Sequence, residues 1–527
     1  MQYNIQYSDN QATMQSAAAE SGANLLEILR EHQAAPEAAC NGKGICGKCR
    51  VRIVQGHAPE TEEDRRFFTA QELAQGYRLA CKVRIQDHLT VHVPDSRMEV
   101  RTLGLEQPED RTEIRAFAEY NIAVDLGSTT LAAVLIDAAG KQLAQAAAVN
   151  SQRVYGADVI SRMQASNEGK RKQLQTCICR DLEQLFQTLV SRQKEPVRIS
   201  RIAIAGNTTM LHLLRGYSCE QLGQAPFTPV NLELECLNYE ELFAEVPGCS
   251  GSQVYLLPGI SAFIGADITA GLYSSGFWQN GKEQPSFFID LGTNGELAYG
   301  RRDGFVTAST AAGPAFEGGR LSCGVPGIPG AVCKVSYLYH RVRVQTIGQK
   351  KPCGICGTGA MEAAAALLQE GLMDTDGLLA PELFSSGLLL ARAEDGRQIC
   401  LTQADIREIQ MAKAAIRAGI EVLQKIYQKE CREEAPVQAG RIYLAGGFGY
   451  YLSADTAAAI GLFPPEWKDR IVLCGNTSLK GAAAFLTDPS CASELENIRG
   501  KNRSVRLESD PDFYHIYVQE MRFPVSR

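Results

Sequence analysis

One phrase occurs twice in this chain, first as Ile122-Ala-Val-Asp-Leu-Gly-Ser-Thr-Thr130 and then as Phe288-Ile-Asp-Leu-Gly-Thr-Asn-Gly295. Each copy starts with an apolar run typical of a buried strand and continues into a polar turn that contains glycine. One copy alone would be weak evidence, because strand-turn-strand hairpins occur in every fold class. The repetition, within text that alternates strands and helices, predicts an α/β protein with two similar lobes.

The turn of each hairpin carries backbone N–H and hydroxyl donors, which a phosphate chain accepts. Two such turns facing each other across a cleft would hold a triphosphate from both sides. Asp125 and Asp290 end the two strands and supply carboxylates that Mg²⁺ or its waters need, although they could instead cap local turns. The residues predicted to contact phosphate are Gly127, Ser128, Thr129 and Thr130 in one lobe and Gly292, Thr293, Asn294 and Gly295 in the other.

A third glycine turn follows the apolar run Ile442-Tyr-Leu-Ala. Because glycine lets the backbone lie against a flat base and ribose, we expect this turn to border adenosine through Gly446, Gly447 and Gly449. A simple strand-to-helix turn is the alternative. Two helices of small residues, 265–272 and 479–485, can pack backbone against backbone, as a hinge between lobes requires. Asp267 opens the first of them, where it could align a nucleophile or merely cap the helix.

Near the amino end, the run Cys40-Asn-Gly-Lys-Gly-Ile-Cys46-Gly-Lys-Cys49 is followed by Cys81. This spacing is typical of the ligands of a [2Fe-2S] cluster, and the glycines let the backbone wrap around it. Structural zinc usually takes two close cysteine pairs, whereas only Cys46 and Cys49 form one here. Predicted strands at 3–7, 50–54 and 88–93 and a helix at 23–31 complete a region that resembles a β-grasp ferredoxin, nearer the adrenodoxin-like subtype than the plant subtype.

The composition limits the class of protein. A chain of 527 residues is too long for one hydrophobic core, and a hydrophobic content of 45% is enough to form several cores. No apolar stretch approaches the eighteen residues of a membrane span, and the amino end lacks a signal pattern, so we expect a cytoplasmic protein without a membrane partner. The formal net charge of -7, without a concentrated basic face, argues against nucleic acid as a partner.

The order of phosphate hairpin, connecting helix, second hairpin, adenosine turn and second connecting helix resembles the superfamily of actin, sugar kinases and heat-shock chaperones, with its ribonuclease H-like lobes. Three further phrases, together with the ferredoxin unit, look like the reductive activators of corrinoid proteins: Gln152-Arg-Val-Tyr-Gly-Ala-Asp-Val-Ile-Ser-Arg162, Ala205-Gly-Asn-Thr-Thr-Met210 and Gly313-Pro-Ala-Phe-Glu-Gly318. This resemblance implies an enzyme that uses ATP and Mg²⁺ to drive one electron from its cluster onto the cob(II) form of a corrinoid methyl-carrier protein, restoring cob(I).

These motifs predict the domain organisation. Residues 1–95 form the ferredoxin-like domain, 120–275 the first ATPase lobe and 276–487 the second lobe with its connecting helix. Between them, 96–119 is expected to be a linker that lets the cluster domain swing, or else a segment packed on a neighbour. Residues 488–527 are a C-terminal segment to which the sequence assigns no chemistry.

The residue roles follow from the same motifs. We assign Asp125, Asp290 and Asp267 to catalysis and the four amino-terminal cysteines to the cluster. Glu317 could touch nucleotide or be an exposed loop carboxylate. Cys353 and Cys356 could form a redox dithiol, but the pair precedes an alanine-rich helix and more resembles a turn with buried thiols.

Two other functions remain open at this point. A redox-regulated small-molecule kinase would phosphorylate an acid or sugar in a pocket beside Asp267. An activator of a non-corrinoid enzyme, such as a radical dehydratase, usually bridges a four-iron cluster between two subunits, which the ferredoxin spacing disfavours. The sequence does not indicate which reductase or ferredoxin supplies electrons, or whether the chain forms a homodimer.

Overall fold

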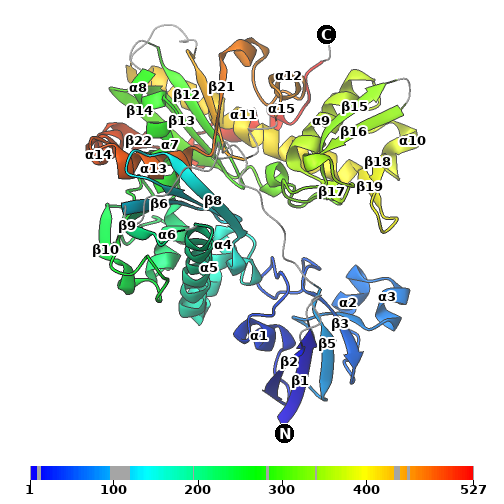
Figure 1. Cartoon of the computed structure of the whole chain (residues 1–527). Coiled ribbons are helices and arrows are strands. Elements are labelled where there is room, and N and C mark those ends of the chain that lie inside the picture. The colour runs from blue at the N-terminus through cyan, green and yellow to red at the C-terminus, as the bar shows by residue number, and fades with distance from the viewer. Residues whose placement is uncertain are drawn as a thin grey trace.

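The computed structural model describes residues 2–8, 14–94, 119–193, 195–280, 284–338, 341–431, 439–447 and 452–525. Residues 96–118 of the predicted linker, and Gly449 of the predicted adenosine turn, lie outside these ranges. Figure 1 shows an amino-terminal domain next to α4 and α5, with the two lobes of the remaining chain above it. Within the described part of the chain, no helix is long and apolar enough to cross a membrane.

The amino-terminal domain is built on a five-stranded sheet of order β2-β1-β5-β3-β4, in which β1 and β5 run parallel. The helix α1 (Leu25–Glu31) begins where Asn24 accepts the N–H groups of Leu26 and Glu27, and it buries Leu25 and Leu29. This sheet with one main helix confirms the predicted ferredoxin-like fold. Its other elements are β1 (Gln2–Ser8), β2 (Met14–Glu20), β3 (Arg50–Gln55), α2 (Glu62–Phe67), α3 (Ala70–Ala74), β4 (Tyr77–Leu79) and β5 (Leu89–His92).

The first lobe contains a six-stranded sheet of order β10-β11-β9-β6-β7-β8. Strands β6, β7 and β8 form an antiparallel meander, and β9 and β11 extend it in parallel from β6. Its strands are β6 (Glu119–Leu126), β7 (Thr130–Ile136), β8 (Gln142–Val149), β9 (Arg198–Gly206), β10 (Glu235–Asn238) and β11 (Gln253–Leu256). Its helices are α4 (Val159–Ala165), α5 (Arg171–Ser191) and α6 (Thr208–Arg215).

The second lobe repeats this topology in a sheet of order β21-β20-β12-β13-β14-β22. Again three antiparallel strands are followed by two parallel ones, so β12, β13, β14, β20 and β21 correspond to β6, β7, β8, β9 and β11. The duplication predicted from the repeated phrase is therefore confirmed. The strands are β12 (Ser286–Leu291), β13 (Gly295–Arg301), β14 (Gly304–Thr310), β20 (Ile442–Ala445), β21 (Ile471–Gly475) and β22 (Asn502–Ser504).

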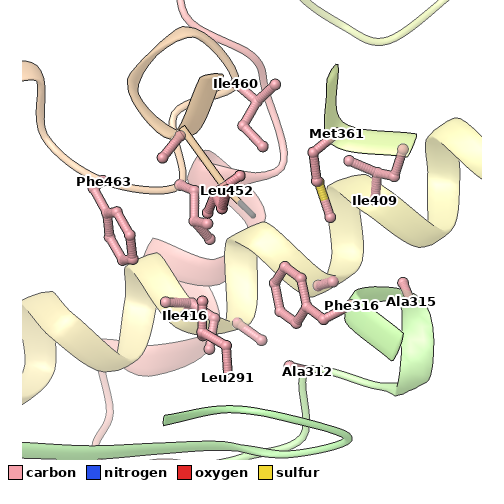
Figure 2. Close-up of a cluster of buried hydrophobic side chains, with 14 of the residues drawn as sticks. Leu291, Ala312, Ala315, Phe316, Met361, Ile409, Ile416, Leu452, Ile460 and Phe463 are labelled. Carbon is pink, nitrogen blue, oxygen red and sulfur yellow. The ribbon is translucent and has the colours of Figure 1, made fainter. Parts of the chain in front are cut away.

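The long helix α11 (Gln403–Cys431) packs the core of the second lobe. Figure 2 shows Ile409 and Ile416 of this helix among buried side chains that include Leu291 and Phe316. Position 295 requires glycine, because a Cβ there would lie 2.1 Å from Ile416 Cδ1. The helix therefore packs directly against the hairpin that is predicted to bind phosphate in the second lobe.

The two helices of small residues pack against each other as predicted. They are α7 (Ala266–Ser274) and α13 (Thr477–Thr487). A Cβ on Gly481 would lie 2.4 Å from the carbonyl oxygen of Ala270, and one on Gly271 would lie 2.8 Å from the Phe288 ring. Only glycine permits this approach. Helix α13 also packs on β6 and β9 of the first lobe, while α7 reaches Phe288 of β12 in the second.

The C-terminal segment is an integral part of the second lobe. Its strand β22 pairs with β14, after α14 (Cys491–Lys501), and α15 (Phe513–Glu520) packs on α11. The fully buried Lys413 of α11 donates to the carbonyl oxygens of Glu520 and Arg522 at 2.5 and 2.6 Å. These bonds fix the end of the chain to the core helix.

A smaller subdomain projects from the second lobe, at the upper right of Figure 1. It contains the sheets β16-β15-β17 and β18-β19, which the sequence did not single out. Its elements are β15 (Ala331–Leu338), β16 (Arg341–Thr346), β17 (Gly354–Ile355), α9 (Gly357–Gln369), α10 (Pro381–Phe384), β18 (Leu388–Arg392) and β19 (Gln398–Leu401), while α8 (Phe277–Asn280) and α12 (Ala454–Ala459) lie elsewhere in the lobes.

Candidate functional site

The first hairpin turn joins β6 to β7 and is held from behind. The carbonyl oxygens of Gly127 and Thr129 accept bonds from Asn150, both at 3.0 Å, and that of Ser128 accepts one from Arg162 at 2.6 Å. A Cβ on Gly127 would lie 2.4 Å from the carbonyl oxygen of Thr130, so the turn requires glycine. Because the carbonyl groups of the turn face Asn150 and Arg162, its trans peptide N–H groups point away from these two residues.

The second turn joins β12 to β13 and lies opposite the first. The Glu317 carboxylate links the two, because its Oε2 accepts the Thr129 hydroxyl at 3.2 Å and the Thr293 hydroxyl at 2.5 Å. Two predicted phosphate donors from different lobes thus meet at one carboxylate oxygen. Glu317 is half-buried, and it is not the exposed loop carboxylate that the sequence left open.

The three predicted catalytic aspartates come together between the lobes. Burial raises the pKa of Asp267 to about 7, with a further contribution from Asp125. Burial raises the pKa of Asp290 to about 8, with contributions from Asp267, Asp125 and Glu317. Asp267 is not the helix cap, since Gly265 takes that position, and it accepts the Ile268 N–H at 2.9 Å.

Asp125 is held by two side chains that the sequence analysis did not assign. Its carboxylate accepts the Asn476 amide at 2.8 Å and the Ser478 hydroxyl at 2.7 Å. Burial raises its pKa, while these two bonds oppose the rise. A signal was present, because Gly475-Asn-Thr-Ser478 repeats Gly206-Asn-Thr-Thr209, and each asparagine caps a helix that follows a strand.

A further carboxylate, Glu296 of β13, also escaped the sequence analysis. Its pKa is raised well above the usual value by burial and by Asp267 and Asp290, while Ser309 donates to it at 3.3 Å. The mutual repulsion that raises these pKa values would be relieved by a cation between the carboxylates, which favours their ionised form. No three His, Cys, Asp or Glu side chains of the described residues are arranged to hold a metal by themselves. Mg²⁺ would therefore need water and phosphate oxygens as additional ligands, which is its usual coordination.

The predicted adenosine turn begins beside this cluster. Gly446 has φ +90°, and a Cβ there would lie 2.7 Å from Asp290 Oδ1. No atom of the described residues lies within 4 Å of the position that a Cβ of Gly447 would take. Gly446 therefore lets the backbone pass close to the Asp290 carboxylate, and Gly447 leaves open space beside it.

The four amino-terminal cysteines lie as two neighbouring pairs, Cys40 with Cys46 and Cys49 with Cys81. The Cys46 thiol and the backbone N–H groups of residues 44–46 lower the pKa of Cys40 to about 4, against the effect of burial. Glycines 42, 44 and 47 have φ between +68° and +81°, which wraps the loop around these sulfurs. Two thiol pairs with N–H donors fit two irons with two thiolates each.

Cys353 and Cys356 lie apart from both sites. Burial raises the pKa of both thiols, that of Cys356 to about 11. The Cys356 thiol donates to the Val332 carbonyl oxygen at 3.2 Å. A raised pKa disfavours the thiolate that redox chemistry needs, so the half-buried Cys353 and the buried Cys356 fit the interpretation as part of the turn before α9.

The chain joins a ferredoxin domain to two ribonuclease H-like lobes, whose hairpin turns face each other. This arrangement defines the class of protein as an electron-transfer domain fused to an actin-like ATPase. Three family models match in the same order. They are the 2Fe-2S iron-sulfur cluster binding domain over residues 9–86, the RACo middle region over 120–280, and the C-terminal ASKHA domain of RACo over 284–527.

Whole-chain relatives agree with this class. The chain is 30% identical over 427 residues to the corrinoid activation enzyme RamQ of Eubacterium limosum, across 77% of this chain and 70% of that one. It is 26% identical over 436 residues to a Co(II) methylated amine-specific corrinoid protein reductase of Methanosarcina barkeri, across 77% of each. A solved reductive activator for a corrinoid iron-sulfur protein superposes with a TM-score of 0.70 at 25% identity, over 99% of this chain and 98% of that one.

The chain therefore belongs to the family of reductive activators of corrinoid proteins. It is an enzymatic activator with a [2Fe-2S] domain and an ASKHA ATPase domain.

Proposed function

We propose that this enzyme uses ATP to transfer one electron from its [2Fe-2S] cluster to the cob(II) form of a corrinoid methyl-carrier protein, which restores cob(I) for methyl transfer. The cluster loses one electron and cobalt gains one, while an external reductase or ferredoxin returns an electron to the cluster. The predicted domain division, 1–95, 120–275 and 276–487, with 96–119 as a linker, is part of the proposal.

One observation carries the nucleotide assignment: the Thr129 and Thr293 hydroxyls reach the same oxygen of Glu317. Turns that converge on one oxygen are close enough to bind one polyphosphate between them. In the proposal the hydroxyls and turn N–H groups bind phosphate oxygens. Asp290 and Asp267, whose pKa values lie near neutrality, hold Mg²⁺ or accept a proton from the attacking water.

ATP has a physical purpose in such a reaction. Plant-type two-iron clusters have potentials near about -400 mV, and reduction of cob(II) is harder, so the transfer runs uphill. Each deficit of about 59 mV costs tenfold in the equilibrium constant of a one-electron transfer. Two lobes that close on ATP and open on ADP can shift that equilibrium if the corrinoid partner binds the two states differently. The ligands proposed for the cluster are Cys40, Cys46, Cys49 and Cys81.

The test is to mix reduced protein, Mg·ATP and an oxidised corrinoid methyl-carrier protein and to record the visible spectrum of cob(I). Cys49→Ala should fail for lack of the cluster, and Asp290→Asn should fail for lack of ATP coupling. Cys353→Ala and the exposed Asp303→Asn are matched controls that should activate normally. An Asp290→Asn protein as active as wild type would contradict ATP coupling, and a phosphorylated small molecule would favour a kinase.

A further inference from the structure

The ferredoxin domain is docked on the first lobe through α1. Lys170 Nζ donates to Glu27 Oε2 at 2.6 Å, and Arg30 Nε donates to the Val154 carbonyl oxygen at 2.9 Å. The Arg30 guanidinium also lies 4.9 Å from the centroid of the Tyr155 ring. Arg30 is only 7% exposed, because the lobe covers it. An arginine buried by the lobe and bonded to it marks a specific contact.

The cluster loop takes part in the same contact. The backbone N–H of Ala157 donates to the Ala39 carbonyl oxygen at 3.2 Å, and that of Ala38 donates to Arg153 at 3.4 Å. Beyond Cys40, Lys43 donates to Gln164 at 2.9 Å and Asn41 donates to Glu168 at 3.2 Å. Residues on both sides of Cys40 thus touch the lobe, so docking covers this side of the cluster loop.

The segment that receives the ferredoxin domain also holds the first phosphate turn. It comprises residues 150–162, with η1 (Ser151–Val154) and the start of α4. Asn150 bonds the carbonyl oxygens of Gly127 and Thr129, and Arg162 bonds that of Ser128. Arg162 Nε also donates to the Gly156 carbonyl oxygen at 3.0 Å, next to the Tyr155 ring under Arg30.

Arg162 is a buried cation that no carboxylate of the described residues contacts directly, although Asp158, Asp181 and Glu317 attract it from farther away. It is fully buried, and its partners are the carbonyl oxygens of Ser128 and Gly156, the Gln152 amide oxygen and the Met210 sulfur, all neutral. Burying a charge is costly unless an opposite charge compensates it. A phosphate at the turn would add a further negative charge, since Arg162 lies directly behind Ser128.

We infer that residues 150–162 couple nucleotide binding to docking of the ferredoxin domain, so that ATP releases the docked domain. The inference rests on the proposed binding of ATP at Gly127–Thr130. In the structure with the ferredoxin domain docked, Glu317 accepts a hydrogen bond from the Thr129 hydroxyl. Phosphate competes for that hydroxyl and attracts Arg162 away from Gly156, which loosens the surface on which Arg30 lies. Coupling is reciprocal, so undocking must raise the affinity for ATP by the same factor.

The test uses the oxidised, cluster-loaded full chain and a non-hydrolysable Mg·ATP analogue. Hydrogen exchange followed by mass spectrometry reports on the interdomain amides of Ala38 and Ala157. We expect the analogue to speed exchange in both peptides at least about fivefold, the lower end of typical coupling. Lys170→Glu, which places a second carboxylate against Glu27, should show fast exchange without nucleotide. By calorimetry it should bind the analogue at least about fivefold more tightly.

Lys172→Glu is the matched control, because it makes the same charge change two residues away on an exposed side chain. It should leave both exchange and affinity as in wild type. If the analogue binds without changing exchange at either amide, or if Lys170→Glu binds it as wild type does, the coupling is refuted and the proposed function stands. If wild type does not bind the analogue, both the coupling and the ATP assignment are wrong.

Discussion

Binding of Mg·ATP should release protons from the aspartate cluster, and the amount can be worked out from the structure. With pKa values of about 8 and about 7, Asp290 is about nine-tenths protonated and Asp267 about half protonated at pH 7. A bound Mg²⁺ favours the ionised form of both groups. From Asp290 and Asp267 alone we therefore expect a release of between about one and about one and a half protons per nucleotide at pH 7.

The aspartates can be separated by substitution. Asp290→Asn should leave about half a proton, because Asp290 is mostly protonated and uncharged at the pH where Asp267 titrates, so its replacement changes the pKa of Asp267 little. Asp267→Asn should lower the number of protons released by about half a proton and keep most of the release from Asp290. At pH 9 both groups are already ionised in the free enzyme, so wild type should release only about a tenth of a proton.

The assay is isothermal titration calorimetry in several buffers of equal pH and different ionisation enthalpy, with Mg²⁺ saturating ATP. The slope of the observed enthalpy against the buffer enthalpy gives the number of protons released. Without Mg²⁺, the phosphate charge favours protonated carboxylates, so release should disappear. Equal release at pH 7 and pH 9, or wild-type release from Asp290→Asn, would refute the reasoning.

Three further outcomes follow from packing and charge. Because burial raises the pKa of Asp290, its protonated form stabilises the nucleotide-free fold at low pH, and this contribution is lost as the pH rises towards 8. The free energy of unfolding, measured by urea melts from pH 5 to 9, should therefore fall less steeply with pH in Asp290→Asn than in wild type. Gly481→Ala should lower the free energy of unfolding by about 1–3 kcal/mol, because its methyl group clashes with Ala270. Gly500→Ala is the control at an open helical position and should raise the free energy of unfolding by about 0.5–1 kcal/mol. Thermal melts of both variants and wild type measure the two effects. Lys413→Met leaves two buried carbonyl groups without a donor and should cost about 1–3 kcal/mol, with faster proteolysis of the C-terminal residues; an unchanged digest would contradict this role.

Much of the fold was predictable because its signals are local. The two hairpins and the cysteine run each follow from periodicity, spacing and turn residues within a few residues of one another. The predicted close packing of α7 and α13 also rested on local composition, namely small residues at successive helical turns. The subdomain of β15 to β19 lacks such a signal, since its short strands carry no repeat or glycine motif that distinguishes them.

The candidate site was predictable in its parts and not in its connections. The sequence indicated Asp125, Asp267 and Asp290 separately, but their raised pKa values depend on mutual distance and burial. Glu317 was ambiguous because a carboxylate in a glycine loop has no preferred partner until the loop is placed. Asn476 was missed because a capping asparagine is common, and only the repeat of its phrase sets it apart.

The sequence by itself determined the two kinds of unit, since cysteine spacing and repeated strand-turn phrases specify local chemistry through covalent order. Tertiary structure alone decided which groups meet: Thr129 and Glu317 are 188 residues apart in the chain, Asp125 and Asn476 are 351 apart, and Arg30 and Val154 are 124 apart. Such contacts depend on how whole sheets and helices pack, because burial and chain closure, and not neighbouring residues, set the distances between these groups and the charges they hold.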